Sequence, residues 1–228
     1  MSYAFPPPPQ VSVPIASRDN SFPVHRVYCI GRNYGDHVKE MGGDPKQEPP
    51  LFFSKPPSAI VINNVDVSYP PATKELHHEV ELVVALCSGG HDIAVDAALG
   101  NVFGYAVGVD FTRRDLQAEA KRDGKPWDLA KGFDQSAPIS AIQPLVGVSP
   151  PADSAITLSV DGQLKQNGKL SQMIWSVPEI ISELSRYFEL RAGDLIFTGT
   201  PAGVSAVERG QHIAAAIAGV GAVEFTLV

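Results

Sequence analysis

The sequence predicts a mixed α+β fold in which strands predominate. The apolar run at residues 82–86 has no polar alternation, which is typical of a strand that is covered on both faces, and residues 102–109 form a second strand-like run. From residue 156 onward the chain consists mainly of short strand-like segments that are separated by turns. Only one long helical pattern stands among them, at residues 173–190, so helices are expected to be few.

Length and charge limit the classes of protein to which the chain can belong. With 228 residues it can bury a large core, and a single domain at residues 24–228 is the preferred interpretation. The formal net charge of -7 argues against nucleic acid or an anionic membrane as a partner, so a small molecule is expected instead. No apolar stretch approaches the roughly 18 residues of a membrane-spanning helix and no signal peptide is recognisable, which predicts a cytoplasmic protein.

Proline and cysteine each add one expectation. Residues 1–23 contain an unbroken proline run at 6–9, which favours extended polyproline geometry and predicts an N-terminal arm that cannot enter a sheet interior. The two cysteines, Cys29 and Cys87, lie in apolar strand-like runs. Both are therefore expected to be buried free thiols in a reducing compartment.

The elements of the N-terminal half follow from alternation and from turn residues. Residues 24–30 alternate as a strand, and a Gly-Arg-Asn-Tyr-Gly segment ends it before a short helical piece at 36–41. Residues 60–67, which include an Asn-Asn turn, are expected to form a hairpin. Thr112 and Asp115 are spaced as a capping box, which predicts that a helix begins beside them.

The C-terminal half is expected to contain two hairpins and one helix. Residues 157–161 and 165–168 flank an Asp-Gly turn, and the tail repeats this arrangement with 211–218 and 222–228 around a Gly-Val-Gly segment. The helix at 173–190 has apolar side chains at helical spacing. Those expected in the core are Ile174, Val177, Ile181, Leu184 and Phe188.

Two glutamates precede the apolar run at 82–86. In an extended chain Glu79 and Glu81 point to the same face and stand roughly 7 Å apart. Carboxylates that lead into a buried strand lose their hydration, which is costly unless a positive charge meets them. A hard divalent cation such as Mg²⁺ or Mn²⁺ would offset that cost. The alternative is an edge strand whose glutamates face water.

A third carboxylate, Asp110, stands where the apolar run at 102–109 stops. By itself it can be the neighbour of a helix cap. Together with Glu79 and Glu81 it completes a set of three oxygen ligands that can converge on one ion, while water and substrate fill the remaining positions.

A histidine and a glutamate share one face of the predicted helix at 36–41. His37 and Glu40 are three positions apart, which permits a carboxylate-oriented imidazole, an arrangement suited to a general base. The alternative is a solvated ion pair on a surface helix. The Gly42-Gly43-Asp44-Pro45 segment that follows would allow a mobile lid.

Two lysines and one glycine-rich turn are further candidates. Lys55 stands where an apolar strand is stopped by proline, so it either reaches solvent or points into a site. Lys131 has no helical periodicity to explain it, which suits a positioned cation. The Gly199–Gly203 turn follows a strand and can present backbone N–H groups to an anion.

Several short motifs, taken in order along the chain, resemble those of one family. They are Gly31-Arg32-Asn33-Tyr34 with Asp36-His37, His78-Glu79-Val80-Glu81-Leu82, Gly104-Tyr105 leading to Asp110, Arg113-Arg114-Asp115 with Gln117, Lys131-Gly132-Phe133-Asp134, and Phe197-Thr198-Gly199-Thr200-Pro201-Ala202-Gly203-Val204. In residues and spacing they resemble the fumarylacetoacetate hydrolase superfamily, and within it the bacterial fumarylpyruvate and other acylpyruvate hydrolases. The resemblance covers nearly the whole chain from Arg26 to the C-terminus.

The resemblance implies a rolled, mixed β-sheet with short flanking helices, a homodimer, and one Mg²⁺ or Mn²⁺ per subunit. It also assigns side chains to three roles. The metal ligands are Glu79, Glu81 and Asp110, the catalytic residues are His37, Glu40 and Lys131, and the substrate-binding residues are Arg32, Lys55, Arg114, Gln117 and Thr200. Four residues stay open as contacts for a distal carboxylate of the substrate: Tyr34, Arg113, Arg122 and Trp127.

The same resemblance implies metal-dependent hydrolysis of the C–C bond of an acylpyruvate, with fumarylpyruvate favoured, in gentisate-type degradation of aromatic compounds. His37, oriented by Glu40, would deprotonate water, and Lys131 would stabilise the oxygen that becomes an enolate. Three alternatives stay open. They are decarboxylation of oxaloacetate, isomerisation or hydration of a 2-hydroxy-dienoate, and a non-catalytic protein that binds a keto acid.

Overall fold

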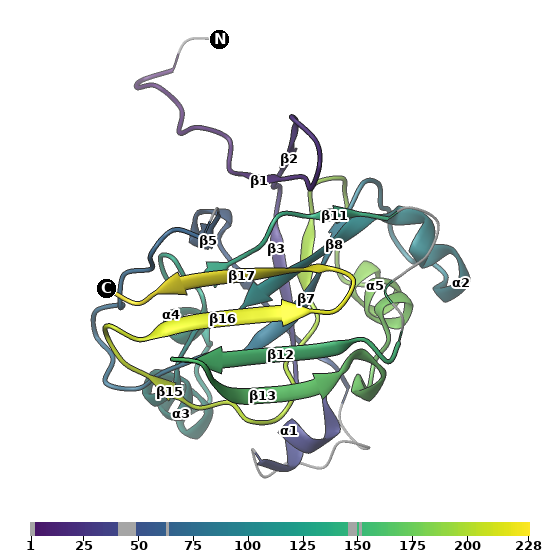
Figure 1. Cartoon of the computed structure of the whole chain (residues 1–228). Coiled ribbons are helices and arrows are strands. Elements are labelled where there is room, and N and C mark those ends of the chain that lie inside the picture. The colour runs from purple at the N-terminus through teal and green to yellow at the C-terminus, as the bar shows by residue number, and fades with distance from the viewer. Residues whose placement is uncertain (1–2, 41–48, 63, 146–149, 151) are drawn as a thin grey trace.

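In the computed structural model, which describes residues 3–40, 49–62, 64–145, 150 and 152–228, two β-sheets pack against each other (Figure 1). The larger sheet has six strands in the order β11-β8-β7-β14-β3-β4. These are β3 (Val27–Gly31), β4 (Leu51–Lys55), β7 (Val80–Leu86), β8 (Val102–Val109), β11 (Gln143–Pro144) and β14 (Leu195–Phe197). The β14–β3 pair is parallel and the other pairs are antiparallel, so the sheet is mixed, as predicted.

A four-stranded antiparallel sheet, in the order β13-β12-β16-β17, covers one face of the larger sheet (Figure 1). Its strands are β12 (Ala155–Val160), β13 (Gln163–Lys169), β16 (His212–Ile217) and β17 (Gly221–Thr226). Burial alternates along β12 and β16, so one face of each strand lies in the core. Both hairpins predicted for the C-terminal half are therefore confirmed, with bounds that differ by a few residues.

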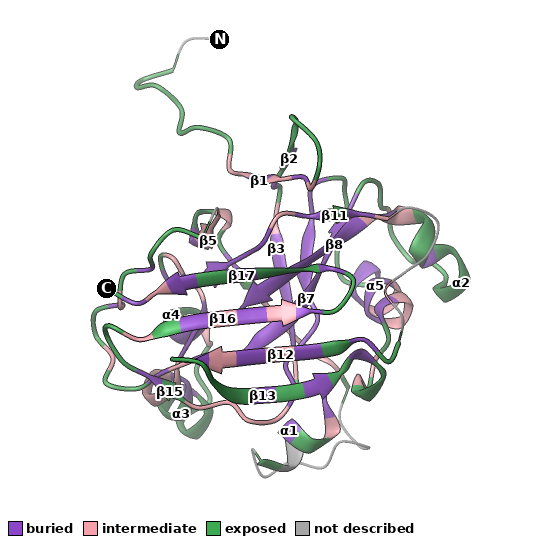
Figure 2. Cartoon of the chain, viewed as in Figure 1, coloured by how far each residue is buried: buried purple, intermediate pink, exposed green. Residues whose placement is uncertain are grey.

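Strand β7 lies in the middle of the larger sheet, and every residue in it is buried (Figure 2). Leu82, Val84 and Leu86 belong to the core cluster that the four-stranded sheet shares. Val83 and Ala85 point to the opposite face and belong to a second core cluster. The predicted strand with cover on both faces is confirmed.

Part of the predicted N-terminal arm contributes to this second cluster. Strands β1 (Ser12–Pro14) and β2 (Ser21–Pro23) pair with each other, and Val13 and Phe22 are buried in the cluster. Residues 3–10 are exposed and extend away from the sheets (Figure 2). The first part of this region is an arm, and the second part covers the core.

Short elements complete the fold, which is mostly β, as predicted. Small sheets join β5 (Ile60–Val61) to β10 (Ala137–Pro138), and β15 (Ala206–Val207) to β6 (Leu76–His77) and β9 (Thr112–Arg113). The helices are α1 (Gly35–Glu40), α2 (Val95–Ala98), α3 (Arg114–Asp123), α4 (Asp128–Lys131) and α5 (Val177–Ser185), with single 3₁₀ turns at Pro57–Ala59, Leu99–Asn101 and Leu170–Gln172. Across the described ranges, no helix is both long enough and apolar enough to span a membrane.

The expected hairpin at residues 60–67 is wrong. β5 pairs in parallel with β10, and Val67 forms a parallel bridge with Leu227. The backbone groups that would have paired within a hairpin therefore pair with β10 and Leu227, which are distant in the sequence. Asn63, the first residue of the expected turn, lies outside the described residues.

The expected capping box is also wrong. Thr112 lies in β9, and α3 begins only at Arg114, without a side-chain cap. The carboxylate of Asp115 accepts hydrogen bonds from the Thr73 hydroxyl at 2.6 Å and from the Lys74 backbone N–H at 2.9 Å. Asp115 thus ties α3 to the segment before β6.

The helix predicted at 173–190 is shorter in the structure, where α5 begins after Ser176. Ser176 and Glu179 form a capping box at that start. Ile174 and Phe188 were expected in the core, but they lie outside the helix and are 37% and 40% exposed. Apolar residues at helical spacing therefore continue on both sides of the segment that is actually helical and buried.

The two cysteines differ in exposure. Cys29 is buried in β3, as predicted, and both thiols are free. The prediction is wrong for Cys87, which is exposed. Cys87 directly follows the last residue of β7, where the chain leaves the sheet.

Candidate functional site

Glu79, Glu81 and Asp110 converge at one end of the six-stranded sheet. One carboxylate oxygen from each lies within 4.8 Å of the other two, and all three residues are buried. The two glutamates flank Val80, which pairs with Val109 at the end of β8. The backbone N–H of Asp110 donates to the carbonyl of Glu79 at 2.8 Å, so the register of β7 and β8 brings the three carboxylates together.

Three basic side chains from three different elements reach this carboxylate cluster. Lys131 Nζ, at the end of α4, donates to Glu79 Oε2 at 2.8 Å and to Asp110 Oδ2 at 2.6 Å. Lys55 Nζ, at the end of β4, lies 2.8 Å from Asp110 Oδ1. Arg114, at the start of α3, forms an ion pair with the other oxygen of Glu79. Glu79 and Asp110 are therefore each paired at both oxygens.

These contacts determine the charge of the paired groups. Burial alone would raise the pKa of Glu79, but Lys131 and Arg114 hold that pKa well below its ordinary value. Burial alone would lower the pKa of Lys131, but Asp110 and Glu79 raise it above its ordinary value. Lys131 is consequently a fixed positive charge at neutral pH and cannot act as a base there.

Glu81 is in a different position. Within the described part of the chain it forms no ion pair, and its Oε2 accepts the backbone N–H of Gly199 at 2.8 Å. Burial raises the pKa of Glu81 well above its ordinary value, and Asp110 and Glu79 raise it further. Ionisation at neutral pH therefore needs an additional positive charge, and three carboxylate oxygens are donors that Mg²⁺ and Mn²⁺ prefer. The cluster fits a divalent metal ion.

His37 and Glu40 lie on α1 and face each other. His37 Nδ1 is 3.6 Å from Glu40 Oε2, which is longer than a hydrogen bond, and the imidazole is buried while the glutamate is exposed. Burial lowers the pKa of His37, so the ring is neutral at pH 7 and can accept a proton. The segment expected to act as a lid, 42–45, lies outside the described residues.

The Gly199–Gly203 turn contacts both Glu81 and Glu40. The Gly199 N–H meets Glu81, and the Gly203 N–H donates to Glu40 at 3.2 Å. The turn does present amides to anions, and these anions are carboxylates of the chain itself. Both glycines have a φ of +94°, and a Cβ on Gly199 would lie 2.7 Å from the Cβ of Asn33.

Two buried amide side chains hold this turn, and no sequence pattern singled them out for a functional role. Gln166, on β13, donates to Thr200 Oγ1 at 2.8 Å and accepts the Val80 N–H at 3.0 Å. Asn33 donates to the carbonyl of Thr198 at 2.7 Å. In the sequence, Asn33 stood out only as a member of the Gly31-Arg32-Asn33-Tyr34 motif. No sequence pattern pointed to Gln166, because its hydrogen-bond partners are distant in the sequence.

The five residues predicted to bind substrate fall into three groups. Lys55 and Arg114 contact the carboxylate cluster directly. Gln117 is buried and accepts a hydrogen bond from Arg114 at 2.6 Å, and Thr200 is buried in the glycine-rich turn. Arg32 is exposed, with a φ of +63°, just before α1.

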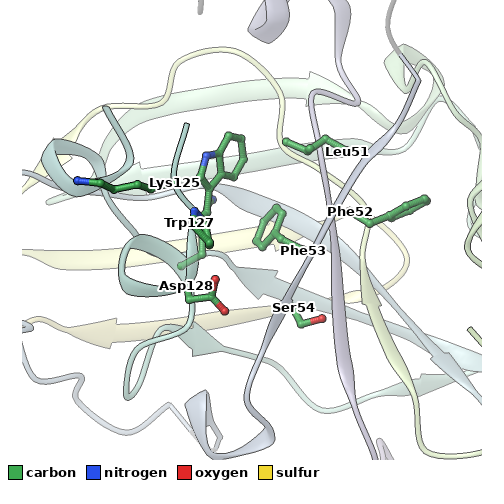
Figure 3. A pocket seen from close by; sticks show the side chains of 9 residues that line it. Leu51, Phe52, Phe53, Ser54, Lys125, Trp127 and Asp128 are labelled. Carbon is green, nitrogen blue, oxygen red and sulfur yellow. The ribbon is translucent and has the colours of Figure 1, made fainter. Parts of the chain in front are cut away.

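A cavity of about 410 Å³ adjoins the site at Lys131 (Figure 3). It is lined by Leu51, Phe52, Phe53, Ser54, Lys125, Pro126, Trp127, Asp128 and Lys131. The rings of Phe53 and Trp127 lie beside each other, with centroids 5.9 Å apart, and Lys131 Nζ lies 5.0 Å from the Phe53 ring. The carboxylates do not line this cavity, so it meets the site only through Lys131.

Comparisons with known proteins agree with this geometry. Residues 26–228 match the family model described as fumarylacetoacetate (FAA) hydrolase C-terminal. The crystal structure of fumarylpyruvate hydrolase from Pseudomonas aeruginosa in complex with Mn²⁺ and pyruvate is 49% identical, with a TM-score of 0.97. The match covers 100% of this chain and 99% of that chain.

Other similar proteins have different reactions in their names. The oxaloacetate tautomerase FAHD1 of Rattus norvegicus is 46% identical over 199 residues, which are 87% of this chain and 90% of that protein. The 5-carboxymethyl-2-hydroxymuconate delta-isomerase of Mycobacterium smegmatis is 30% identical, with a TM-score of 0.80, over 96% of this chain and 82% of that chain. The first is similar in sequence and the second in sequence and fold, but the reactions in their names differ.

Proposed function

The chain belongs to the fumarylacetoacetate hydrolase family, and from that premise we propose that it hydrolyses the C3–C4 bond of an acylpyruvate. Fumarylpyruvate is the proposed substrate, and fumarate and pyruvate are the products. The observation that carries the proposal is the convergence of three buried carboxylates, one of which, Glu79, lies within electrostatic reach of the buried imidazole of His37. A close structural relative is named a fumarylpyruvate hydrolase and holds Mn²⁺ and pyruvate, which supports the same interpretation.

We assign the metal site to Glu79, Glu81 and Asp110, with one Mg²⁺ or Mn²⁺ per subunit. When bound, such an ion acts as a Lewis acid toward the oxygens of a keto acid. Lys131 holds Glu79 and Asp110 in place through hydrogen bonds of 2.8 and 2.6 Å and supplies a second fixed positive charge for a developing enolate oxygen.

We assign the general base to His37, with Glu40 as the residue that orients it. His37 takes a proton from water, and the resulting hydroxide adds to the 4-oxo carbon of the substrate. The C3–C4 bond then breaks, and its electron pair passes to the pyruvate half as an enolate. Protonation at C3 gives pyruvate, and the acyl half leaves as a carboxylic acid.

The remaining assignments are extensions of this proposal. Arg32, Lys55, Arg114, Gln117 and Thr200 contact the substrate or orient the groups that do. The catalytic domain spans residues 24–228 and acts as a cytoplasmic homodimer in aromatic degradation. Of these features, the size-exclusion mass of the purified protein tests the dimer directly.

Metal binding provides the first test of this function, through stability as well as activity. An ion at 100 times its Kd stabilises the folded state by about 2.7 kcal/mol, so Mg²⁺ should raise the free energy of unfolding of the EDTA-treated protein by that amount. Glu81→Gln should abolish the increase. Glu224→Gln, which changes an exposed glutamate on β17, should retain it. An unchanged increase in Glu81→Gln contradicts the ligand assignment.

Removal of the imidazole provides the second test. His37→Ala should lower kcat for fumarylpyruvate by about 10²- to 10⁴-fold, which is the usual contribution of a general base. His212→Ala, which removes an exposed histidine at the start of β16, should leave kcat unchanged. A kcat within a few-fold of wild type in His37→Ala would show that another group deprotonates the water.

The rat relative gives one specific reason for a second candidate function, which is tautomerisation of oxaloacetate. That reaction moves a proton at C3 and needs no attacking water, so it requires a proton carrier and a positive site for the enolate oxygen. Absorbance assays of fumarylpyruvate cleavage and of the oxaloacetate enol on one preparation distinguish the two reactions. Loss of oxaloacetate as carbon dioxide and pyruvate would identify a decarboxylase.

A further inference from the structure

One cation on α3, Lys121, is not used by the proposed mechanism. Arg114, Gln117 and Lys121 are spaced i, i+3 and i+7, so they share one face of α3. Arg114 contacts Glu79 and Gln117, whereas Lys121 lies a further turn away from the carboxylates. Lys121 therefore continues the line of polar side chains that begins at the metal site.

Lys121 has no acidic partner among the residues that the structure describes. Its Nζ lies 5.3 Å from the centroid of the Trp127 ring. The residue is exposed as a whole, yet partial burial of its ammonium group lowers the pKa of Lys121 to about 8, and repulsion from Arg114 and Arg32 adds to this shift. The contact with Trp127 holds the side chain, but it leaves the ammonium N–H groups without a hydrogen-bond acceptor among the described residues. An ammonium group in this state is suited to binding a carboxylate.

We propose that Lys121 binds the carboxylate at the far end of the acyl half of the substrate. This inference rests on the proposed acylpyruvate hydrolysis and names the class of acylpyruvate. The carboxylate cluster and Lys131 serve the pyruvoyl end, and Lys121 lies beyond them along α3. The site therefore selects acylpyruvates whose acyl group ends in a carboxylate over those that end in a methyl group.

Two other cations that the sequence left open have partners of their own. Arg122 is exposed, and its Nε donates to Asp123 at 2.7 Å. Arg113 donates to the carbonyl of Leu129 at 3.0 Å, and its guanidinium lies over the Phe133 ring. Lys121 differs from both because its ammonium group has no acceptor within the described ranges.

The test compares kcat/KM for fumarylpyruvate and acetylpyruvate in four proteins: wild type, Lys121→Gln, Lys121→Arg and Arg122→Gln. Lys121→Gln should lower kcat/KM for fumarylpyruvate by about 10- to 100-fold, mainly through KM, because one charge-assisted hydrogen bond is lost. Its kcat/KM for acetylpyruvate should stay within about twofold of wild type. Lys121→Arg should recover most of the loss, and Arg122→Gln should match wild type for both substrates.

Several outcomes would overturn the inference. Lys121 has no role in specificity if Lys121→Gln leaves fumarylpyruvate turnover unchanged, or if both substrates lose kcat/KM equally, as a structural role predicts. An equal effect in Arg122→Gln would show that the net charge of α3 acts without a defined contact.

The inference can also be separated from the proposed reaction. If wild type cleaves neither substrate, the proposed function fails, and binding of fumarate and crotonate to the Mg²⁺-treated protein then tests Lys121. Fumarate has a second carboxylate where crotonate has a methyl group. Lys121→Gln should weaken fumarate binding at least 10-fold and leave crotonate binding unchanged, and equal effects on the two would refute the inference.

Discussion

Two sets of partners hold the carboxylates of the site, and they differ in kind. The first set, the cationic wall, consists of Lys55, Lys131 and Arg114, which reach the carboxylates with long side chains. The second set, the amide wall, is the Gly199–Gly203 turn, which meets Glu81 and Glu40 with backbone N–H groups. Full charges hold Glu79 and Asp110, whereas backbone dipoles hold Glu81.

This difference shows how the site combines rigidity with a place for a metal ion. The cationic wall holds the pKa of Glu79 well below its ordinary value and places Lys131 Nζ 2.6 Å from Asp110 Oδ2. The amide wall donates one hydrogen bond to Glu81 but supplies no counter-ion, and burial raises the pKa of this carboxyl well above its ordinary value. The cluster therefore keeps a preference for a cation although three basic side chains surround it.

The largest expected effect comes from breaking the cationic wall. Lys131→Met removes the ammonium group that Glu79 and Asp110 share, and two buried carboxylates then lose a partner. The free energy of unfolding in EDTA should fall by about 3–5 kcal/mol, measured by urea denaturation. Lys125→Met, which changes an exposed lysine nearby, should show no such loss. A loss below about 1 kcal/mol would mean that the carboxylates are protonated or solvated.

A smaller effect is expected from steric change in the amide wall. Gly199→Ala combines an unfavourable positive φ with a Cβ that would lie 2.7 Å from Asn33, and should cost about 3 kcal/mol of stability. Gly210 has a φ of +85°, and no atom lies within 4 Å of the position that a Cβ would take there, so Gly210→Ala isolates the backbone strain. Thermal unfolding of both variants measures the difference. Equal losses would show that the close approach to Asn33 is unimportant.

The smallest effect is expected from Gln166, whose side chain donates a hydrogen bond to Thr200 in the amide wall. Gln166→Ala leaves the Val80 N–H and the Thr200 hydroxyl without their buried partner, at a cost of about 1–3 kcal/mol. Affinity for Mg²⁺, measured by calorimetry, should also fall, since Val80 lies between two of the carboxylates. Gln163→Ala, at an exposed position on the same strand, serves as the control. Unchanged stability in Gln166→Ala would show that water replaces its hydrogen bonds.

The carboxylates and the Gly199–Gly203 turn could be predicted from the sequence, whereas the side chains that support the turn could not. Strand alternation placed Glu79 and Glu81 on one side, and the cost of burying charge required a positive partner, which was expected to be a divalent cation. Arg114 entered only through the family resemblance. The role of Gln166 depends on how β13 lies against the turn, which no local pattern encodes. The capping box at Thr112 failed for the same reason, because Thr73, far along the chain, supplies the partner of Asp115.

The cover on both faces of β7 has a consequence for how the protein is made. One cover comes from residues 12–23, near the beginning of the chain, and the other includes β16 and β17, near its end. Contacts between such distant segments form slowly, because long loops must close first. A ribosome-bound chain that has not yet released β17 would still expose part of this strand to water. The newly synthesised polypeptide therefore completes the cover of β7, the strand that carries Glu81, only after β17 has emerged from the ribosome.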